Sequence, residues 1–77
     1  MKKYTLREIK DFVKIGIASD ITNYSNAEMR EFLKAHDTEK IGYSAGINGI
    51  NGGLLQDRNN GEMYAITARN AALLTAF

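Results

Sequence analysis

Hydrophobic residues near the start of the chain recur at the spacing of an α-helix. Placed at about 100° per residue, the apolar positions from Leu6 to Ile17 share one broad face. They are Leu6, Ile9, Phe12, Val13, Gly16 and Ile17. Thr5 and Glu8 have the spacing of a capping box, in which each side chain binds the backbone N–H of the other residue. We therefore expect an amphipathic helix to begin after Thr5, with Ile15 off its apolar face.

The same signals return between Ser25 and Asp37. Ser25 and Glu28 repeat the capping-box spacing. One stripe of the following residues is apolar or aromatic, and it comprises Met29, Phe32, Leu33 and His36. A second, shorter amphipathic helix is predicted here. Because the connection between the two helices is short, we expect them to pack as neighbours in a helical hairpin or corner.

After Lys40 the apolar positions recur at every second residue, which indicates a β-strand. One face carries Ile41, Tyr43, Ala45 and Ile47. The other face carries Gly42, Ser44 and Gly46. Those residues are small enough for a helix or another backbone to approach the strand closely.

Residues 46–53 read Gly-Ile-Asn-Gly-Ile-Asn-Gly-Gly and raise the question of a phosphate-binding loop. A Walker loop needs a lysine and a Ser or Thr after its last glycine, whereas Leu54 and Leu55 follow Gly53. Asn-Gly pairs favour tight turns, so the stretch is interpreted as a chain reversal. We place the reversal at Asn48-Gly49 and put Asn51-Gly52 in the next strand, as a bulge or a site of close approach.

The remaining residues predict a hairpin and an ambiguous tail. Asn60-Gly61 separates two runs rich in Leu, Tyr and Ile, which is typical of a β-hairpin. In the tail, Asn70 could cap a helical turn that places Leu73, Leu74 and Phe77 on one side. Leu73, Thr75 and Phe77 also alternate as in an edge strand. Both interpretations of the tail stay open.

These elements predict an α+β fold in a single small domain spanning residues 1–77. Two N-terminal amphipathic helices pack on a small antiparallel sheet of two or three strands, with a hairpin around Asn60-Gly61. A short C-terminal helical turn or edge strand completes the fold. With 44% apolar and 25% charged residues, the composition is that of a folded globular protein.

The composition limits the cellular setting and the chemistry. There is no cysteine, which excludes disulfides and thiolate metal sites and leaves oligomerisation as the reinforcement for a small core. Charged residues interrupt the N-terminus before any long apolar run, so we expect neither a signal peptide nor a membrane span. The expected location is the cytoplasm.

The candidate catalytic chemistry is sparse. His36 is the only histidine, and its place in the last turn of a helix is better explained by the helix dipole and the edge of the core than by catalysis. No serine lies in a nucleophile motif, and no loop has calcium-binding spacing. We therefore expect no enzymatic activity, no cofactor and no bound metal ion.

Two surfaces remain as candidate sites. The C-terminal apolar residues exceed what a small core needs and predict a protein interface made by Tyr64, Arg69, Leu73, Leu74 and Phe77. The leading hypothesis is accordingly a non-enzymatic, self-associating protein-interaction module, whose apolar C-terminal surface and sheet edge meet a second copy or another protein. The alternative is a small nucleic-acid-binding regulator whose phosphate contacts are Lys2, Lys3, Arg7, Lys10 and Lys14. The net charge of +1 does not favour this alternative.

Overall fold

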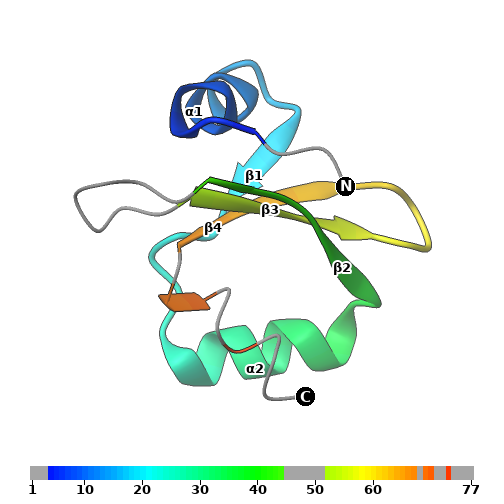
Figure 1. Cartoon of the computed structure of the whole chain (residues 1–77). Helices are drawn as coiled ribbons and strands as arrows, with labels where there is room; N and C mark the ends of the chain where they lie inside the picture. Colours follow the sequence, from blue (N-terminus) through cyan, green and yellow to red (C-terminus); the bar gives the residue numbers. More distant parts are fainter. Residues whose placement is uncertain (1–3, 45–51, 68, 71–72, 74–77) are drawn as a thin grey trace.

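The structure, a computed structural model, describes residues 4–44, 52–67, 69–70 and 73 (Figure 1). These residues form two helices and one four-stranded sheet. In chain order the elements are α1 (Leu6–Lys14), β1 (Ala18–Asp20), α2 (Asn26–Ala35), β2 (Thr38–Ser44), β3 (Gly52–Asp57) and β4 (Met63–Thr67). The α+β class is confirmed. The predicted sheet of two or three strands is wrong, because a further strand, β1, lies between the two helices.

Both predicted helix starts are confirmed. Thr5 and Glu8 form a complete capping box before α1, with both hydrogen bonds at 3.1 Å. Ser25 and Glu28 form the second one before α2, at 3.0 and 3.2 Å. These bonds satisfy N–H groups that a helix leaves unpaired at its first turn.

The first helix ends earlier than its hydrophobic pattern suggests. Ile15 is its C-cap, and Gly16 follows in the left-handed region with a φ of +83°. Glycine at this position commonly ends a helix because it has no Cβ to clash. The prediction that Ile17 lies on the buried helical face is therefore wrong, and the chain turns there into β1.

The sheet is mixed, with the strand order β1-β4-β3-β2. β3 is antiparallel to both β2 and β4, whereas β1 is parallel to β4, with Ser19 opposite Tyr64. β1 and β2 thus run in the same direction along the two edges of the sheet. α2 connects them by crossing one face, and such a crossover lets two strands run parallel. An entirely antiparallel sheet is therefore a wrong prediction.

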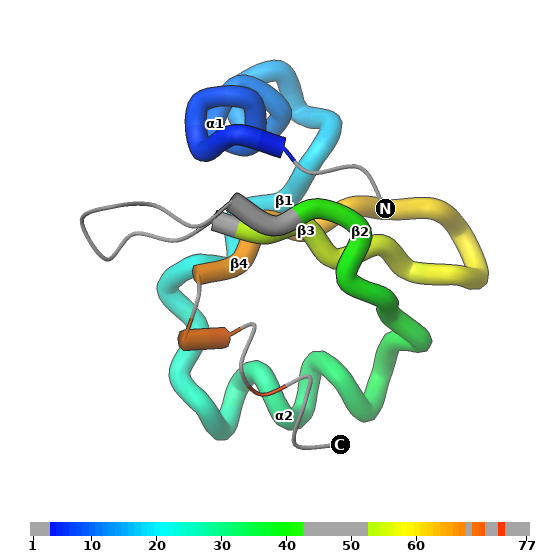
Figure 2. Tube along the Cα trace, in the orientation of Figure 1, coloured from blue at the N-terminus to red at the C-terminus, as the bar shows by residue number. Residues whose placement is uncertain are grey.

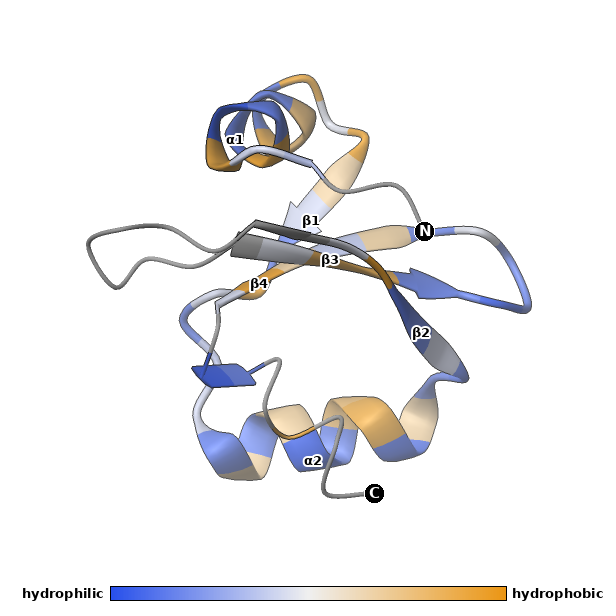
Figure 3. Ribbon diagram, in the orientation of Figure 1, coloured by the Kyte–Doolittle hydropathy of each residue, from blue (hydrophilic) through white to orange (hydrophobic). Residues whose placement is uncertain are grey.

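The helices lie on opposite faces of the sheet (Figure 1). Successive residues of a strand point to opposite faces, so β3 and β4 contribute to two apolar clusters. The cluster under α1 is Ile9, Ala18, Leu54 and Ala65. The cluster under α2 is Ile21, Met29, Leu55, Tyr64 and Ile66. A helical hairpin or corner is therefore a wrong prediction, although each helix does pack its apolar face on the sheet (Figure 3).

The traces of β2 and β3 run side by side (Figure 2). They pair from Thr38 opposite Asp57 to Ser44 opposite Gly52, with a bulge between Lys40 and Gly42. Residues 45–51 lie outside the described part of the chain. The prediction that the chain reverses at Asn48-Gly49 concerns these residues, so it stays a prediction. At Gly42, a Cβ would lie 2.9 Å from Cε2 of Tyr4 and closer still to Cδ2. A close approach to this glycine is confirmed, and the approaching group is a side chain.

The hairpin around Asn60-Gly61 is confirmed. Asp57 N–H donates to the Glu62 carbonyl at 2.8 Å, and Gly61 N–H donates to the Asp57 carbonyl at the same distance. Gly61 has a φ of +76°, a conformation that glycine adopts without a steric penalty because it has no Cβ. In the tail, Arg69 and Asn70 have α-helical backbone and Leu73 lies in a 3₁₀ turn.

Candidate interaction surface

Among the residues predicted as a protein interface, the three that the structure describes do not gather into one exposed patch. Tyr64 is 7% exposed and packs edge-on against Phe32, with ring centroids 4.7 Å apart. Its hydroxyl donates to Glu62 Oε2 at 2.8 Å, and burial, together with that carboxylate, raises the pKa of Tyr64 to about 12. Tyr64 belongs to the core under α2 and offers little surface to a partner.

The other predicted interface residues are divided in the same way. Arg69 is exposed, and its Nη2 donates to the Tyr24 carbonyl at 3.2 Å. Leu73 is half-buried and packs against the cluster that contains Met29. Leu74 and Phe77 lie outside the described residues. The described part of this predicted interface thus contributes to packing more than to an open surface.

The basic residues of α1 are accessible to solvent. Arg7, Lys10 and Lys14 are all exposed. Glu8 and Asp11 are exposed on the same helix and oppose their charge. Lys2 and Lys3 lie outside the described residues. The helix therefore presents a mixed surface in which cations outnumber carboxylates by one.

A different apolar feature stands out at the end of α1. Ile15 is 65% exposed and Ile17 is 49% exposed, and they are the exposed large hydrophobic residues of the described chain. Both sit in the turn that leads from α1 into β1. The sequence pattern marked Ile15 as off the helical face, but it placed Ile17 inside. The sequence feature that could have predicted the exposure of Ile17 is Gly16, because a glycine at this position commonly ends a helix.

These isoleucines lie in the turn that leads into β1, which is an edge strand of the sheet. Proteins commonly protect edge strands with bulges and charged side chains, because unpaired backbone groups there attract other strands. β2, at one edge, has both kinds of protection: the bulge after Lys40, and the charges of Glu39 and Lys40. β1, at the other edge, contains Ala18, Ser19 and Asp20, with neither a bulge nor a lysine. Its protection is its shortness and the exposed carboxylate of Asp20.

The direction of the β1 backbone groups follows from one hydrogen bond. Ile21 N–H donates to the Ala65 carbonyl of β4 at 3.1 Å. Backbone polar groups alternate between the two sides of a strand, so those of Ser19 also face β4. The polar backbone groups of Ala18 and Asp20 then point away from the sheet, toward its outer edge.

A cleft of about 370 Å³ lies between α1 and the carboxyl ends of β1 and β4. Its apolar lining includes Leu6, Ile9, Val13, Ala65 and Ile66. Its polar lining is Lys10, Asp20, Thr22, Asn23 and Thr67. The cleft is thus mainly apolar, with an ionisable group of each sign among its lining residues.

Asp20 is fixed at this cleft by its neighbour Thr22. The Thr22 hydroxyl donates to Asp20 Oδ1 at 2.6 Å, and the Thr22 N–H donates to the same oxygen at 3.0 Å. These two bonds, the hydroxyl first, lower the pKa of Asp20 below its ordinary value. The carboxylate is therefore ionised at neutral pH.

His36 completes the packing of α2. Its Nδ1 donates to the Phe32 carbonyl at 2.9 Å, and its ring stacks on Phe32 with centroids 4.1 Å apart. This is the structural role at the core edge that the helix pattern predicts. Among the described residues, no group of three or more His, Asp or Glu side chains could hold a metal ion.

No helix in the described part of the chain has the length and apolar character needed to cross a membrane. No family model, curated protein or solved structure matches this chain significantly, so its own residues carry what can be said about its function.

Proposed function

We propose that this chain is a non-enzymatic protein-interaction module that self-associates through the face formed by Ile15, Ile17 and the outer edge of β1. We call this surface the β1 face. The observation that carries the proposal is the position of two exposed isoleucines in the turn that leads into an edge strand without a bulge or a lysine. This location differs from the C-terminal surface indicated by the sequence.

The apolar surface at this face favours association. Full burial of an isoleucine side chain contributes about 1.5–3 kcal/mol. Part of that gain is offset by the translational and rotational freedom lost when two molecules associate. Ile15 and Ile17 are already partly covered, so together they support a modest affinity unless the strand edge adds backbone hydrogen bonds.

Size-exclusion chromatography with light scattering, over a range of protein concentrations, tests the proposal. The wild type is expected to shift toward a larger mass as concentration rises. The double variant Ile15→Ser/Ile17→Ser is expected to remain monomeric at the concentrations where the wild type associates. A matched control is Ala27→Ser/Ala35→Ser, which makes two apolar-to-serine changes at exposed positions of α2. Association that is equal in all three proteins would contradict a role for the β1 face.

Nucleic-acid binding is the second candidate, favoured by the exposure of Arg7, Lys10 and Lys14 on α1. Phosphate contacts release counterions, so such a complex should weaken steeply as salt rises. The same chromatography with duplex DNA at low and moderate salt tests this candidate. The charge reversal Lys10→Glu/Lys14→Glu should abolish the complex, and an unchanged DNA affinity would exclude the basic side of α1 as the binding surface.

A further inference from the structure

We infer that the partner at the β1 face is a second copy of this chain, with the two β1 strands paired antiparallel about a two-fold axis through Ser19. The inference rests on the proposed self-association and specifies its geometry. Two four-stranded sheets would join at their β1 edges into one continuous sheet. The interface would be isologous, since each copy uses the same residues.

The backbone of β1 is suited to this pairing. The polar groups of Ala18 and Asp20 point outward, while those of Ser19 face β4, as the bond from Ile21 to Ala65 implies. In an antiparallel pair, residues with outward groups must oppose one another to exchange hydrogen bonds. With Ser19 opposite Ser19, Ala18 of each copy opposes Asp20 of the other. That arrangement forms roughly four intermolecular backbone hydrogen bonds.

Charge and strand length select this register over its two neighbours. A two-fold axis at Asp20 would set two ionised carboxylates directly opposite each other, which is destabilising. An axis at Ala18 would pair Asp20 with Gly16, whose φ of +83° takes it out of the extended conformation. Only the axis at Ser19 matches both outward-facing residues of β1 without opposing like charges.

Pairing with the two-fold axis at Ser19 also covers exposed apolar side chains. Ala18 packs under α1 and Ile21 packs under α2, so Ile17, Ser19 and Ile21 lie toward the α2 side of the sheet. Antiparallel pairing about Ser19 places Ile17 of each copy opposite Ile21 of the other. The half-exposed Ile17 would then extend the second copy's apolar cluster. Ser19, at the axis, is small enough to meet its own copy without a clash.

The association should close at two copies. An open fibre would require the β1 edge of one molecule to join the β2 edge of the next. The bulge between Lys40 and Gly42 and the charges on Glu39 and Lys40 disfavour a new strand at β2. A dimer that uses both β1 edges leaves only protected edges outside.

Disulfide trapping tests the register directly, because the chain has no cysteine of its own. Opposed residues of a non-hydrogen-bonded antiparallel pair have Cα atoms about 4.5 Å apart, which a disulfide can span. The variant Ser19→Cys, incubated with oxidised glutathione, is expected to form a covalent dimer. The rate should exceed that of the control Ala27→Cys, exposed on α2, by at least about tenfold, because pairing raises the local thiol concentration.

Amide hydrogen exchange of the wild type provides a second test that needs no substitution. Raising the concentration into the dimeric range should slow exchange at Ala18 and Asp20 by at least about tenfold, since their N–H groups become paired. The N–H of Ser19 faces β4 in both states, so its exchange should change far less.

The outcomes separate the geometry from the proposed function. Rapid trapping at Ser19 with concentration-dependent protection of Ala18 and Asp20 supports the two-fold pairing. Association that depends on Ile15 and Ile17, but with trapping at Ser19 no faster than at Ala27, overturns the pairing and leaves the interaction module intact. A protein that stays monomeric at every concentration, with no change in exchange, overturns both.

Discussion

The ring of Tyr4 lies directly over Gly42, so close that β2 has no room for a side chain at that position. The same ring packs edge-on against Phe12 of α1, with centroids 5.3 Å apart at 74°. Tyr4 therefore links the start of α1 to β2. The absence of a side chain at Gly42 is what allows the helix and the strand to share this contact.

We expect Gly42→Ala to destabilise the fold by about 1–3 kcal/mol, the usual cost of forcing extra atoms into a packed site. Chemical denaturation monitored by circular dichroism measures the change. In a Tyr4→Ala background the added methyl group has room, so the same substitution should cost much less. Equal costs in the two backgrounds would show that the loss at Gly42 does not arise from the Tyr4 ring.

The local signals in the sequence predicted this fold better than the long-range ones did. The capping boxes at Thr5 and Ser25 and the turn at Asn60-Gly61 depend on residues only a few positions apart, and all three are confirmed. β1 was not predicted because three residues are too few to establish an alternating pattern. Its partner strand begins at Met63, far away in the sequence, so no local signal indicates the pairing. An amphipathic helix fits either face of a sheet, so its pattern could not place α1 and α2 on opposite sides.

The candidate surface was harder to predict for a related reason. Apolar residues near the C-terminus suggested an interface, but Tyr64 is in the core because β4 is a central strand covered on both faces. Ile17 became exposed because Gly16 ended the helix early. Whether an apolar residue is core or surface depends on strand order, which the hydrophobic pattern alone does not contain.

The buried amide of Asn70 provides a second stability prediction. Its Nδ2 donates to the Ile21 carbonyl at 3.4 Å, and its Oδ1 is buried with no hydrogen-bond partner among the described residues. Asn70→Asp keeps the shape but sets a carboxylate oxygen against that carbonyl. We expect a loss of about 1–3 kcal/mol at neutral pH, the cost of a buried polar group left unsatisfied.

The pH dependence of this loss has a definite sign. Burial beside a carbonyl disfavours the charged form, so the substituted carboxyl should have a pKa above its unfolded-state value. The loss relative to wild type should be absent below the unfolded-state pKa and grow as the pH rises to the folded-state pKa. Asn23→Asp, at an exposed position, is the control and should show little of this dependence. A pH-independent loss in Asn70→Asp would contradict the mechanism.

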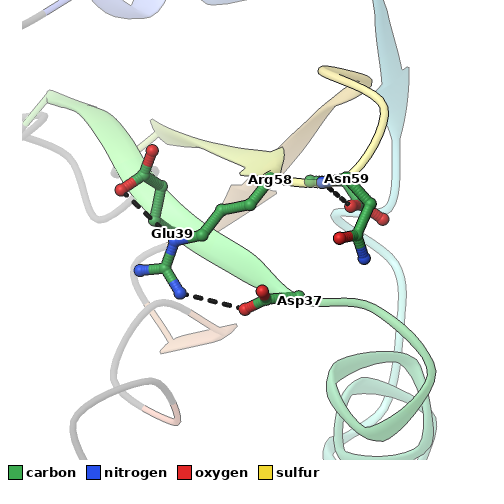
Figure 4. Close-up of polar contacts among 5 residues, drawn as sticks. Asp37, Glu39, Arg58 and Asn59 are labelled. Atoms are coloured by element: carbon green, nitrogen blue, oxygen red, sulfur yellow. Dashed lines mark hydrogen bonds and ion pairs between the residues drawn. The ribbon is translucent and has the colours of Figure 1, made fainter.

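Arg58 attaches the tip of the β3–β4 hairpin to the start of β2 (Figure 4). Its Nη1 lies 2.9 Å from Asp37 Oδ1 and its Nε lies 3.6 Å from Glu39 Oε2. All three side chains are about half exposed, so solvent screens the charges. Arg58→Gln should therefore lower the free energy of unfolding by no more than about 1 kcal/mol.

Salt distinguishes this electrostatic loss from a packing loss. The difference in the free energy of unfolding between Arg58→Gln and wild type should shrink in high salt, because salt screens exposed ion pairs. The control is Arg30→Gln on α2, since Arg30 is exposed and has no ion pair within the described part of the chain. Denaturation curves at low and high salt provide the comparison. A salt-independent loss at Arg58 would point instead to the lost packing of its aliphatic side-chain atoms.

The hydrogen bonds from Thr22 to Asp20 predict how stability responds to acid. Thr22→Val removes the hydroxyl donor and keeps the backbone donor, so the pKa of Asp20 should rise toward its ordinary value. Because the folded-state pKa lies below the unfolded one, Asp20 stabilises the fold above its unfolded-state pKa, and this contribution is lost as the pH falls through the folded-state pKa. Wild type should therefore have a higher free energy of unfolding than Thr22→Val at neutral pH, and this difference should become smaller in acid.

Carboxyl NMR titration measures the pKa of Asp20, and Thr38→Val, on β2, is the matched control. An unchanged Asp20 titration in Thr22→Val would show that the hydroxyl does not set the pKa.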